Sequence, residues 1–390
     1  MMAYISQLRI RNFGPLEEFD YNPTRINVFV GRNNTGKTTI LRAVDLAVHG
    51  NIEDSWYFPF SWSIRNIVKK GKKNAIIETN NEETYIFESM DTVREDLQEL
   101  VNSKLGQALD RFFEKKIPAE RRIDVYSLYL DNFDFAMIVS KNNVSFYPYP
   151  KELPFDAKKY HESFSDIVGS TKTTQRSNDQ LRHRSLMEII PLSLMSEVSR
   201  DDENNNVNYL THYNKIQDQE FTQNEIELRK LEEYIKENHL VNKLDRLTTH
   251  NVMYIKDSGR HDKIDIEPIP YNMHGDGFLA LLNTLHYLLK SEGGILLIEE
   301  PENHLHPAYL EVFVRTIFEY SRKLNVQVFM TSHSYDLIEE ILDYPETDEE
   351  MQAVCITRLQ RLDGTIMGYN YSVERGREVL NDLKLDLRGI

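Results

Sequence analysis

The hydrophobic and polar positions of this chain form short apolar runs and longer segments with helical spacing. Three runs, residues 26–30, 295–298 and 326–330, consist mainly of apolar residues and have the length of buried strands. Segments 39–48 and 335–342, which follow the first and the third run, have the spacing of helices. Strands that alternate with helices in this way predict a parallel sheet in an α/β domain.

Shorter patterns predict further strands near both ends of the chain. Residues 4–21 indicate two strands joined by a turn at Gly14, and residues 74–88 alternate in polarity around a polar turn, as a hairpin does. Segments 353–359 and 365–371 indicate two more strands.

The middle of the chain has a different pattern. Leucine and phenylalanine recur every three to five positions in residues 93–113, which predicts a helix. Residues 123–139 and 144–149 are rich in aromatic residues and more typical of strands, whereas 163–185 is polar and typical of a loop. Residues 220–247 favour one helix of about four heptads at most, which is too short for a long coiled coil and fits an ordinary packed helix.

Composition narrows the class of protein. A chain of 390 residues with 40% hydrophobic and 28% charged residues has room for two or three compact domains. No apolar run approaches the roughly 18 residues of a membrane span, and the first ten residues lack the apolar core of a signal peptide. The single cysteine, Cys355, excludes an internal disulfide framework. We therefore expect a cytoplasmic protein without a membrane partner.

The charge pattern bears on nucleic-acid binding. The formal net charge of −16 argues against a broadly basic surface, although it leaves a local DNA-binding groove open. Two stretches, residues 69–73 and 170–185, are locally basic, and both are interpreted as solvated loops.

Candidate chemistry begins directly after the first strand. Residues 31–38, GRNNTGKT, fit the phosphate-loop pattern G-x-x-x-x-G-K-[ST]. They lie between a predicted strand and a predicted helix, as that motif requires. Its backbone N–H groups and the helix N-terminus cradle phosphates, Lys37 reaches the β- and γ-phosphates, and the Thr38 hydroxyl ligates Mg²⁺. The pattern predicts that ATP and Mg²⁺ bind at Gly31, Arg32, Asn33, Asn34, Thr35, Gly36, Lys37, Thr38 and Thr39.

A phosphate loop needs an acidic strand end to hold the metal and to place the attacking water. Strand 295–298 ends in Glu299 and Glu300, which predicts Glu299 as a metal ligand acting through water and Glu300 as the residue that orients or deprotonates water. Strand 326–330 leads to His333, which is expected at the same sheet edge as a hydrogen-bond donor to the γ-phosphate. The simpler alternatives are a buried strand with surface acids and a structural histidine.

Together these motifs resemble the ATP-binding-cassette superfamily, in the branch of SMC proteins, RecF and the OLD-family ATPases. GRNNTGKT resembles their Walker A motif, ILLIEEPENHLHP resembles Walker B with the following D-loop, and TSHS resembles the histidine switch. A glutamate at position 299, where many relatives have aspartate, is compatible with the OLD-like group. The resemblance implies an α/β P-loop NTPase, an ABC-type ATPase head, with catalytic residues Lys37, Glu300 and His333.

The resemblance also predicts a signature motif before Walker B. Residues 273–290 fit this place, with Gly275, Asp276 and Gly277 in a glycine turn ahead of a helix. In the family this motif contacts the nucleotide of the other protomer, which implies a homodimer, or a higher homo-oligomer, closing over two ATP molecules. The usual signature serine is absent, and Asp276 would repel the phosphate unless it points away or meets a cation.

The family pattern further suggests the division of the chain and its purpose. Residues 1–89 and 265–390 are expected to form the ATPase head, and residues 90–264 an inserted, mainly helical lid or arm. Only 57 residues follow His333 (390 − 333), too few for the Toprim nuclease domain of full-length OLD proteins. The resemblance therefore suggests an ATPase that regulates a separate nuclease or toxin in a DNA-related or anti-phage role. The alternatives are a RecF-like repair ATPase that binds DNA directly and a nucleotide-dependent scaffold with negligible turnover.

Overall fold

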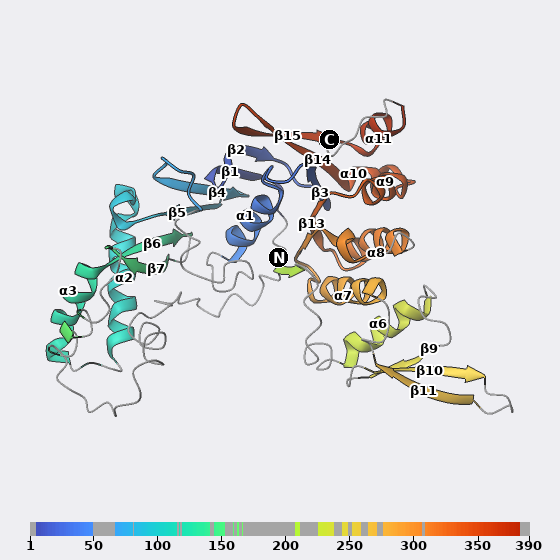
Figure 1. The fold of residues 1–390 in the computed structure, drawn as a ribbon, viewed down its shortest axis with the longest axis horizontal. Helices are drawn as coiled ribbons and strands as arrows, with labels where there is room; N and C mark the ends of the chain where they lie inside the picture. The colour runs from blue at the N-terminus through green and yellow to red at the C-terminus, as the bar shows by residue number, and fades with distance from the viewer. Residues whose placement is uncertain are drawn as a thin grey trace. The chain divides into compact units, whose positions relative to one another are not determined.

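The protein forms two compact units, which are drawn in Figure 1. The first unit contains Met1–Ser6, Asn22–Leu41 and Asn204–Ile390, and the second contains Gln7–Tyr21 and Arg42–Glu203. The computed structural model describes residues 5–49, 67–80, 82–114, 117, 119–140, 144–152, 159, 162–163, 166, 207–210, 225–237, 244–248, 252–258, 264–270, 276–305 and 309–382.

The first unit is built on a six-stranded sheet of order β15-β14-β3-β13-β12-β8. All neighbouring strands are parallel except the pair β14–β15, so the predicted parallel α/β sheet is confirmed. Because β3, β13 and β12 are parallel neighbours, their carboxyl ends meet at one edge of the sheet. The strands are β3 (Ile26–Gly31), β8 (Val207–Leu210), β12 (Ile295–Glu299), β13 (Gln327–Ser332), β14 (Val354–Leu362) and β15 (Thr365–Tyr371).

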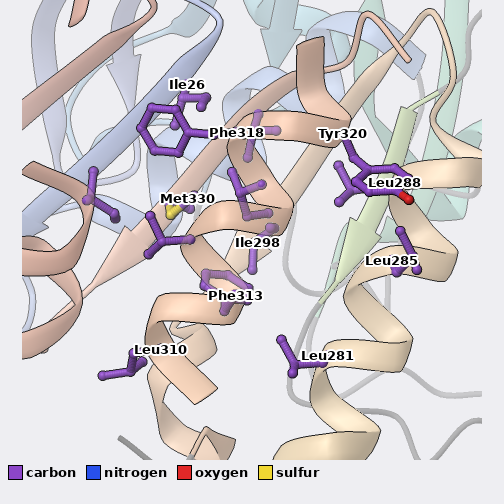
Figure 2. Packing of buried hydrophobic residues seen from close by; sticks show 14 of the residues in the cluster. Ile26, Leu281, Leu285, Leu288, Ile298, Leu310, Phe313, Phe318, Tyr320 and Met330 are labelled. Carbon is purple, nitrogen blue, oxygen red and sulfur yellow. The ribbon is translucent and has the colours of Figure 1, made fainter. Parts of the chain in front are cut away.

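Helices α7, α8 and α9 lie side by side along this sheet (Figure 1). Figure 2 shows Phe313 of α8 beside Ile298 of β12 and Met330 of β13, all three within one buried apolar cluster. Burial of each such side chain contributes roughly 1.5–3 kcal/mol, which holds the strands and their polar ends in place. The helical segments of this unit are α6 (Glu225–Glu237), α7 (Asp276–Lys290), η5 (Pro301–His304), α8 (Leu310–Lys323), α9 (Tyr335–Asp343), α10 (Asp348–Gln352), α11 (Val373–Arg377) and η7 (Glu378–Asp382), while α1 (Lys37–His49) begins in this unit.

A small antiparallel sheet of order β11-β10-β9 also belongs to the first unit. Its strands are β9 (Leu244–Leu247), β10 (Val252–Ser258) and β11 (Ile264–Pro270). The single helix predicted over 220–247 is therefore wrong at its C-terminal end, because α6 ends at Glu237 and β9 begins at Leu244. Leu244 and Leu247 are buried in the cluster that also receives α6, so tertiary burial decides the local structure there.

The second unit contains an antiparallel sheet of order β2-β1-β4-β5-β6-β7 and two longer helices. The predicted hairpins 4–21 and 74–88 and the helix in 93–113 are confirmed within the described residues. Its elements are β1 (Leu8–Phe13), β2 (Leu16–Tyr21), β4 (Asn74–Thr79), β5 (Glu82–Phe87), η2 (Met90–Thr92), α2 (Glu95–Glu114), η3 (Ala119–Arg121), α3 (Arg122–Asn132), β6 (Phe133–Val139) and β7 (Val144–Pro150).

One expectation for the middle of the chain needs correction. Residues 123–132 were expected to be strand-like and form α3, whose Val125 and Tyr129 lie four positions apart and are buried. The Tyr129 ring of α3 stacks 4.8 Å from that of Phe133, the first residue of β6, so this aromatic side chain is buried from a helix. The range 90–264, where a mainly helical insert is predicted, contains strands β6 to β10 and the first residue of β11 as well as α2, α3 and α6.

The compact units follow the pairing of the strands, and the predicted boundaries of the ATPase head and its insert stay a prediction. Residues 42–89 belong to the second unit because β4 pairs with β1 and β5 pairs with β6, and residues 204–264 belong to the first. Most of the polar segment 163–185 lies outside the described residues. None of the described helices has both the length and the apolar character that crossing a membrane requires.

Candidate nucleotide site

Three neighbouring strands bring the predicted site residues to one level of the sheet. Glu299 of β12 is in register with Thr331 of β13, which in turn is in register with Phe29 of β3. The same edge of the sheet therefore carries Glu300, His333 and the loop that starts at Gly31, as the sequence predicts.

The loop between β3 and α1 has the backbone conformation of a phosphate cradle. Gly31, Asn34 and Gly36 have φ angles of 146°, 61° and 86°, which turn the chain tightly before α1 begins at Lys37. The Thr35 hydroxyl donates to the Arg32 carbonyl oxygen at 2.8 Å and closes the loop from inside. The loop therefore leads its backbone directly to a helix N-terminus, where phosphate binds favourably.

The predicted loop residues differ in exposure. Arg32, Asn33 and Asn34 are exposed, Gly31, Thr35, Gly36 and Lys37 are buried, and Thr38 and Thr39 are half-buried at the start of α1. The sequence motif did not reveal that β14 also supports the loop. Arg361 donates from Nη2 to the Asn34 carbonyl oxygen at 3.1 Å.

Gly31 is the position in the loop that leaves least room for a side chain. A Cβ atom there would lie 2.4 Å from the carbonyl oxygen of Leu359 and 3.0 Å from Oγ1 of Thr35. Gly31→Ala is expected to lower the free energy of unfolding by about 1–3 kcal/mol and to weaken nucleotide binding, since the loop must shift. Urea unfolding and nucleotide titration measure the two effects.

The matched control is Gly364→Ala in the turn between β14 and β15. Gly364 also has a positive φ, 86°, but a Cβ atom there meets nothing within 4 Å. Equal losses of stability in the two variants would contradict the steric role assigned to Leu359.

Lys37 is buried beneath the loop and is 5% exposed. Its Nζ donates to the carbonyl oxygens of Gly31 at 2.9 Å and Arg32 at 3.0 Å. Burial lowers the pKa of Lys37 to about 8, although the charges of Glu300, Glu302 and Glu299 act in the opposite direction. The ammonium group is thus held inside the loop among carboxylates, at the place where a phosphate would enter.

Thr38 and Glu299 meet directly across the site. The Thr38 hydroxyl donates a short hydrogen bond to Oε1 of Glu299, a carboxylate that is 8% exposed. A hydroxyl and a carboxylate oxygen in contact are the ligand types that Mg²⁺ takes from proteins that bind it together with nucleotide phosphates. The residues present therefore fit a magnesium ion in this place.

Glu300 and His333 form the second contact of the edge. Nε2 of His333 and Oε1 of Glu300 are 2.8 Å apart, and Oε2 of Glu300 accepts from Nδ2 of Asn303 at 2.9 Å. Glu300 has a φ of 45° and its N–H donates to the Thr331 carbonyl oxygen at 3.1 Å. This left-handed conformation at the end of a strand is costly for a glutamate and recurs at functional sites.

The histidine is held largely in its neutral form. Burial, together with the charge of Lys37, lowers the pKa of His333 below its usual range, while Glu300 and Glu302 act against this shift. In a neutral imidazole whose proton is on Nε2, this N–H donates a hydrogen bond to Oε1 of Glu300.

Glu302 is a residue that sequence reasoning missed. Its Oε1 accepts from Oγ of Ser332 at 2.9 Å and from the N–H groups of His333 at 2.5 Å and Ser334 at 3.0 Å. Its place two residues after Glu300 was visible in the sequence, but its partners lie thirty residues away. The carboxylate links η5 to the end of β13.

The predicted signature motif is only partly described. Gly275 lies outside the described residues, Asp276 is the first residue of α7, and Gly277 is buried in the first turn. The predicted helix is confirmed as α7, but Asp276 and Gly277, which were expected in the turn before it, form its first turn. The contact with a second protomer's nucleotide stays a prediction.

A parallel sheet with a phosphate loop after β3 and two glutamates at the end of β12 defines a P-loop ATPase with the motif order of the ABC type. The AAA ATPase domain model matches residues 2–338, most of the chain, and the protein belongs to this family.

Two curated proteins are similar in sequence. The ATP/GTP phosphatase of Helicobacter pylori is 22% identical over 350 residues, which cover 87% of each chain. Protein MJECL11 of Methanocaldococcus jannaschii is 34% identical over 118 residues, which cover 30% of this chain and 99% of the relative.

Solved structures of SMC heads align along nearly the whole chain. An SMC head bound to the C-terminal winged-helix domain of ScpA has a TM-score of 0.45 and 12% identity and covers 96% of this chain and 99% of its own. The SMC head domain from Thermotoga maritima has a TM-score of 0.43 and 11% identity, with 94% and 99% covered.

Proposed function

We propose that this ATPase hydrolyses Mg·ATP at the edge formed by β3, β12 and β13, and that hydrolysis opens a homodimer that controls a separate effector. The observation that carries the hydrolytic part is the 2.8 Å contact between His333 and Glu300, beside the contact between Thr38 and Glu299. One edge thus combines a phosphate loop, a metal-binding pair and a base.

Binding would begin with an exchange of partners. The Lys37 ammonium leaves the carbonyl oxygens of Gly31 and Arg32 and turns to the β- and γ-phosphates, while the loop N–H groups hold the phosphate oxygens. Thr38 and Glu299 are the residues that would hold Mg²⁺. The metal ion, when bound, neutralises charge on the phosphate oxygens.

Glu300 is the base in this proposal. Asn303 and His333 hold its two carboxylate oxygens, so its direction is set before ATP arrives. Glu300 takes a proton from the attacking water, and the proton on Nε2 of His333 becomes available to the γ-phosphate when the contact with Glu300 opens. The neutral state of His333 suits a donor that must also release its partner.

The dimer and its partners rest on the family resemblance. Gly275, Asp276 and Gly277 would face the ATP of the second protomer, so that two nucleotides lie between two chains. A cytoplasmic location is part of the proposal and agrees with the single cysteine. The solved SMC head bound to ScpA is a precedent for a head with a separate partner protein.

The effector proposed is a nuclease or toxin in a DNA-related or anti-phage role. The net charge of −16 disfavours a broad DNA-binding surface on this chain and supports readout through a protein partner. A RecF-like ATPase that binds DNA directly, through a local groove, is the second candidate. A scaffold with negligible turnover is the third.

Phosphate release with and without double-stranded DNA separates these candidates. We expect turnover with Mg·ATP that changes little when DNA is added and disappears when EDTA removes the metal. Turnover that DNA strongly stimulates would favour the RecF-like alternative, and release no faster than that of Glu300→Gln would favour the scaffold.

A further inference from the structure

Glu302 holds the backbone that carries the histidine switch. One carboxylate oxygen accepts three hydrogen bonds from consecutive residues, from the Ser332 hydroxyl and from the N–H groups of His333 and Ser334. Bonds from backbone N–H groups to a charged carboxylate are about twice as strong as bonds between neutral groups. Ser332 also accepts from the Ser334 N–H at 3.0 Å, so the turn after β13 is closed on itself.

The same short segment holds His333 at two points. Glu300 and Glu302 stand on either side of Pro301, where η5 begins. Glu302 binds the backbone N–H of His333, while Glu300 contacts Nε2 at the far side of the ring. A histidine fixed at both points has a defined position relative to the base, and a change at Glu302 alters that position without removing either catalytic group.

The second carboxylate oxygen of Glu302, Oε2, differs from the first in its surroundings. Among the residues that the structure describes, Oε2 is buried and makes no hydrogen bond. The negative charge of Glu302 also acts on His333, since it opposes the lowering of the histidine pKa by burial. Glu302 is therefore coupled to the residue that carries the switch.

We propose that Glu302 is a positioning residue for ATP hydrolysis, tying η5 to the end of β13 and so holding His333 against Glu300. This role rests on the proposed function and deepens it. Glu302 acts on the reaction only through the place it gives His333.

Steady-state kinetics of Glu302→Ala, Glu302→Gln and His333→Ala test this role. We expect Glu302→Ala to lower kcat by between about 10- and 100-fold with a KM for ATP close to that of the wild type, because a small misplacement of a catalytic group has an effect of this size. Glu302→Gln keeps an oxygen acceptor and should recover part of the rate.

The double variant Glu302→Ala/His333→Ala gives the decisive comparison. If Glu302 acts through His333, removing it lowers kcat no further once the histidine is gone. A loss of equal size in both backgrounds, or a KM that rises in proportion as kcat falls, would overturn the proposal.

Glu350→Ala is the matched control. Glu350 also accepts backbone N–H groups, from Glu346 at 3.2 Å and Thr347 at 3.3 Å, but it caps α10. This variant loses a comparable set of carboxylate bonds and should keep the wild-type kcat.

NMR of the protein labelled at its 12 histidines tests the same contact without turnover. The His333 ring signal, assigned by its loss in His333→Ala, should move in Glu302→Gln and stay unchanged in Glu350→Ala. A His333 signal unaffected by Glu302→Gln would overturn the positioning role. Absent hydrolysis by the wild type, with the signal shifted as expected, would instead overturn the proposed function.

Discussion

Glu300→Gln is expected to bind ATP with nearly wild-type affinity and to hydrolyse it about 10²- to 10⁴-fold more slowly. The substitution keeps the size of the side chain and an oxygen acceptor, so the contact with Asn303 can persist. It removes the carboxylate that takes a proton from water, and general-base catalysis contributes a factor of this size. Phosphate release under saturating Mg·ATP measures the loss.

The same variant should accumulate in the ATP-bound closed state. If hydrolysis opens the dimer, Glu300→Gln with Mg·ATP elutes as a dimer in size-exclusion chromatography, whereas the wild type returns to its nucleotide-free form. Glu346→Gln, at an exposed carboxylate between α9 and α10, is the control and should behave as the wild type. Hydrolysis by Glu300→Gln at the wild-type rate would show that another group activates water.

Lys37→Met is expected to weaken ATP binding by roughly 10- to 100-fold. Methionine keeps much of the apolar stem beneath the loop and removes the ammonium group, whose hydrogen bonds to phosphate are worth about 1.5–3 kcal/mol. Because Lys37 is 5% exposed and its charge is compensated by nearby glutamates, its loss also leaves negative charge facing the phosphates. Titration with a fluorescent ATP analogue measures the affinity.

Lys323→Met is the control for Lys37→Met. Lys323 is an exposed lysine at the end of α8, where its ammonium lies 5.3 Å from the centre of the Tyr320 ring. Its removal should leave the ATP affinity unchanged. An unchanged affinity in Lys37→Met would mean that the loop N–H groups alone carry phosphate binding.

Much of the site is predictable from local sequence because the motif is local. The phosphate loop spans eight residues and includes Gly31, Gly36, Lys37 and Thr38. The spacing of these residues predicts the loop, its turns and the start of α1. The two acids are also visible locally, because Glu299 and Glu300 directly follow the apolar run 295–298. Parallel strands then align at one edge, which places Glu299 beside Thr38 although the two residues are 261 positions apart.

The hydrogen-bond partners of the site residues could not be predicted from the sequence. The hydrogen bonds that Glu302 accepts from residues 332–334, and the one that Arg361 donates to the phosphate loop, join segments that no periodic pattern connects. Their geometry depends on how two strand ends and a short turn pack, and a hydrogen bond requires atoms placed within a few tenths of an ångström.

The sequence by itself determined the strands of the nucleotide edge, the phosphate loop and the order of its acids, because apolar periodicity and glycine spacing act over a few residues. Only the tertiary structure decided that residues 123–132 form a helix, that α6 stops before β9, and that Glu302 holds His333 against Glu300. The helix at 123–132, for example, depends on burial against residues distant in sequence, since Tyr129 shares a buried apolar cluster with Phe87 and Val101, and this burial outweighs local preference.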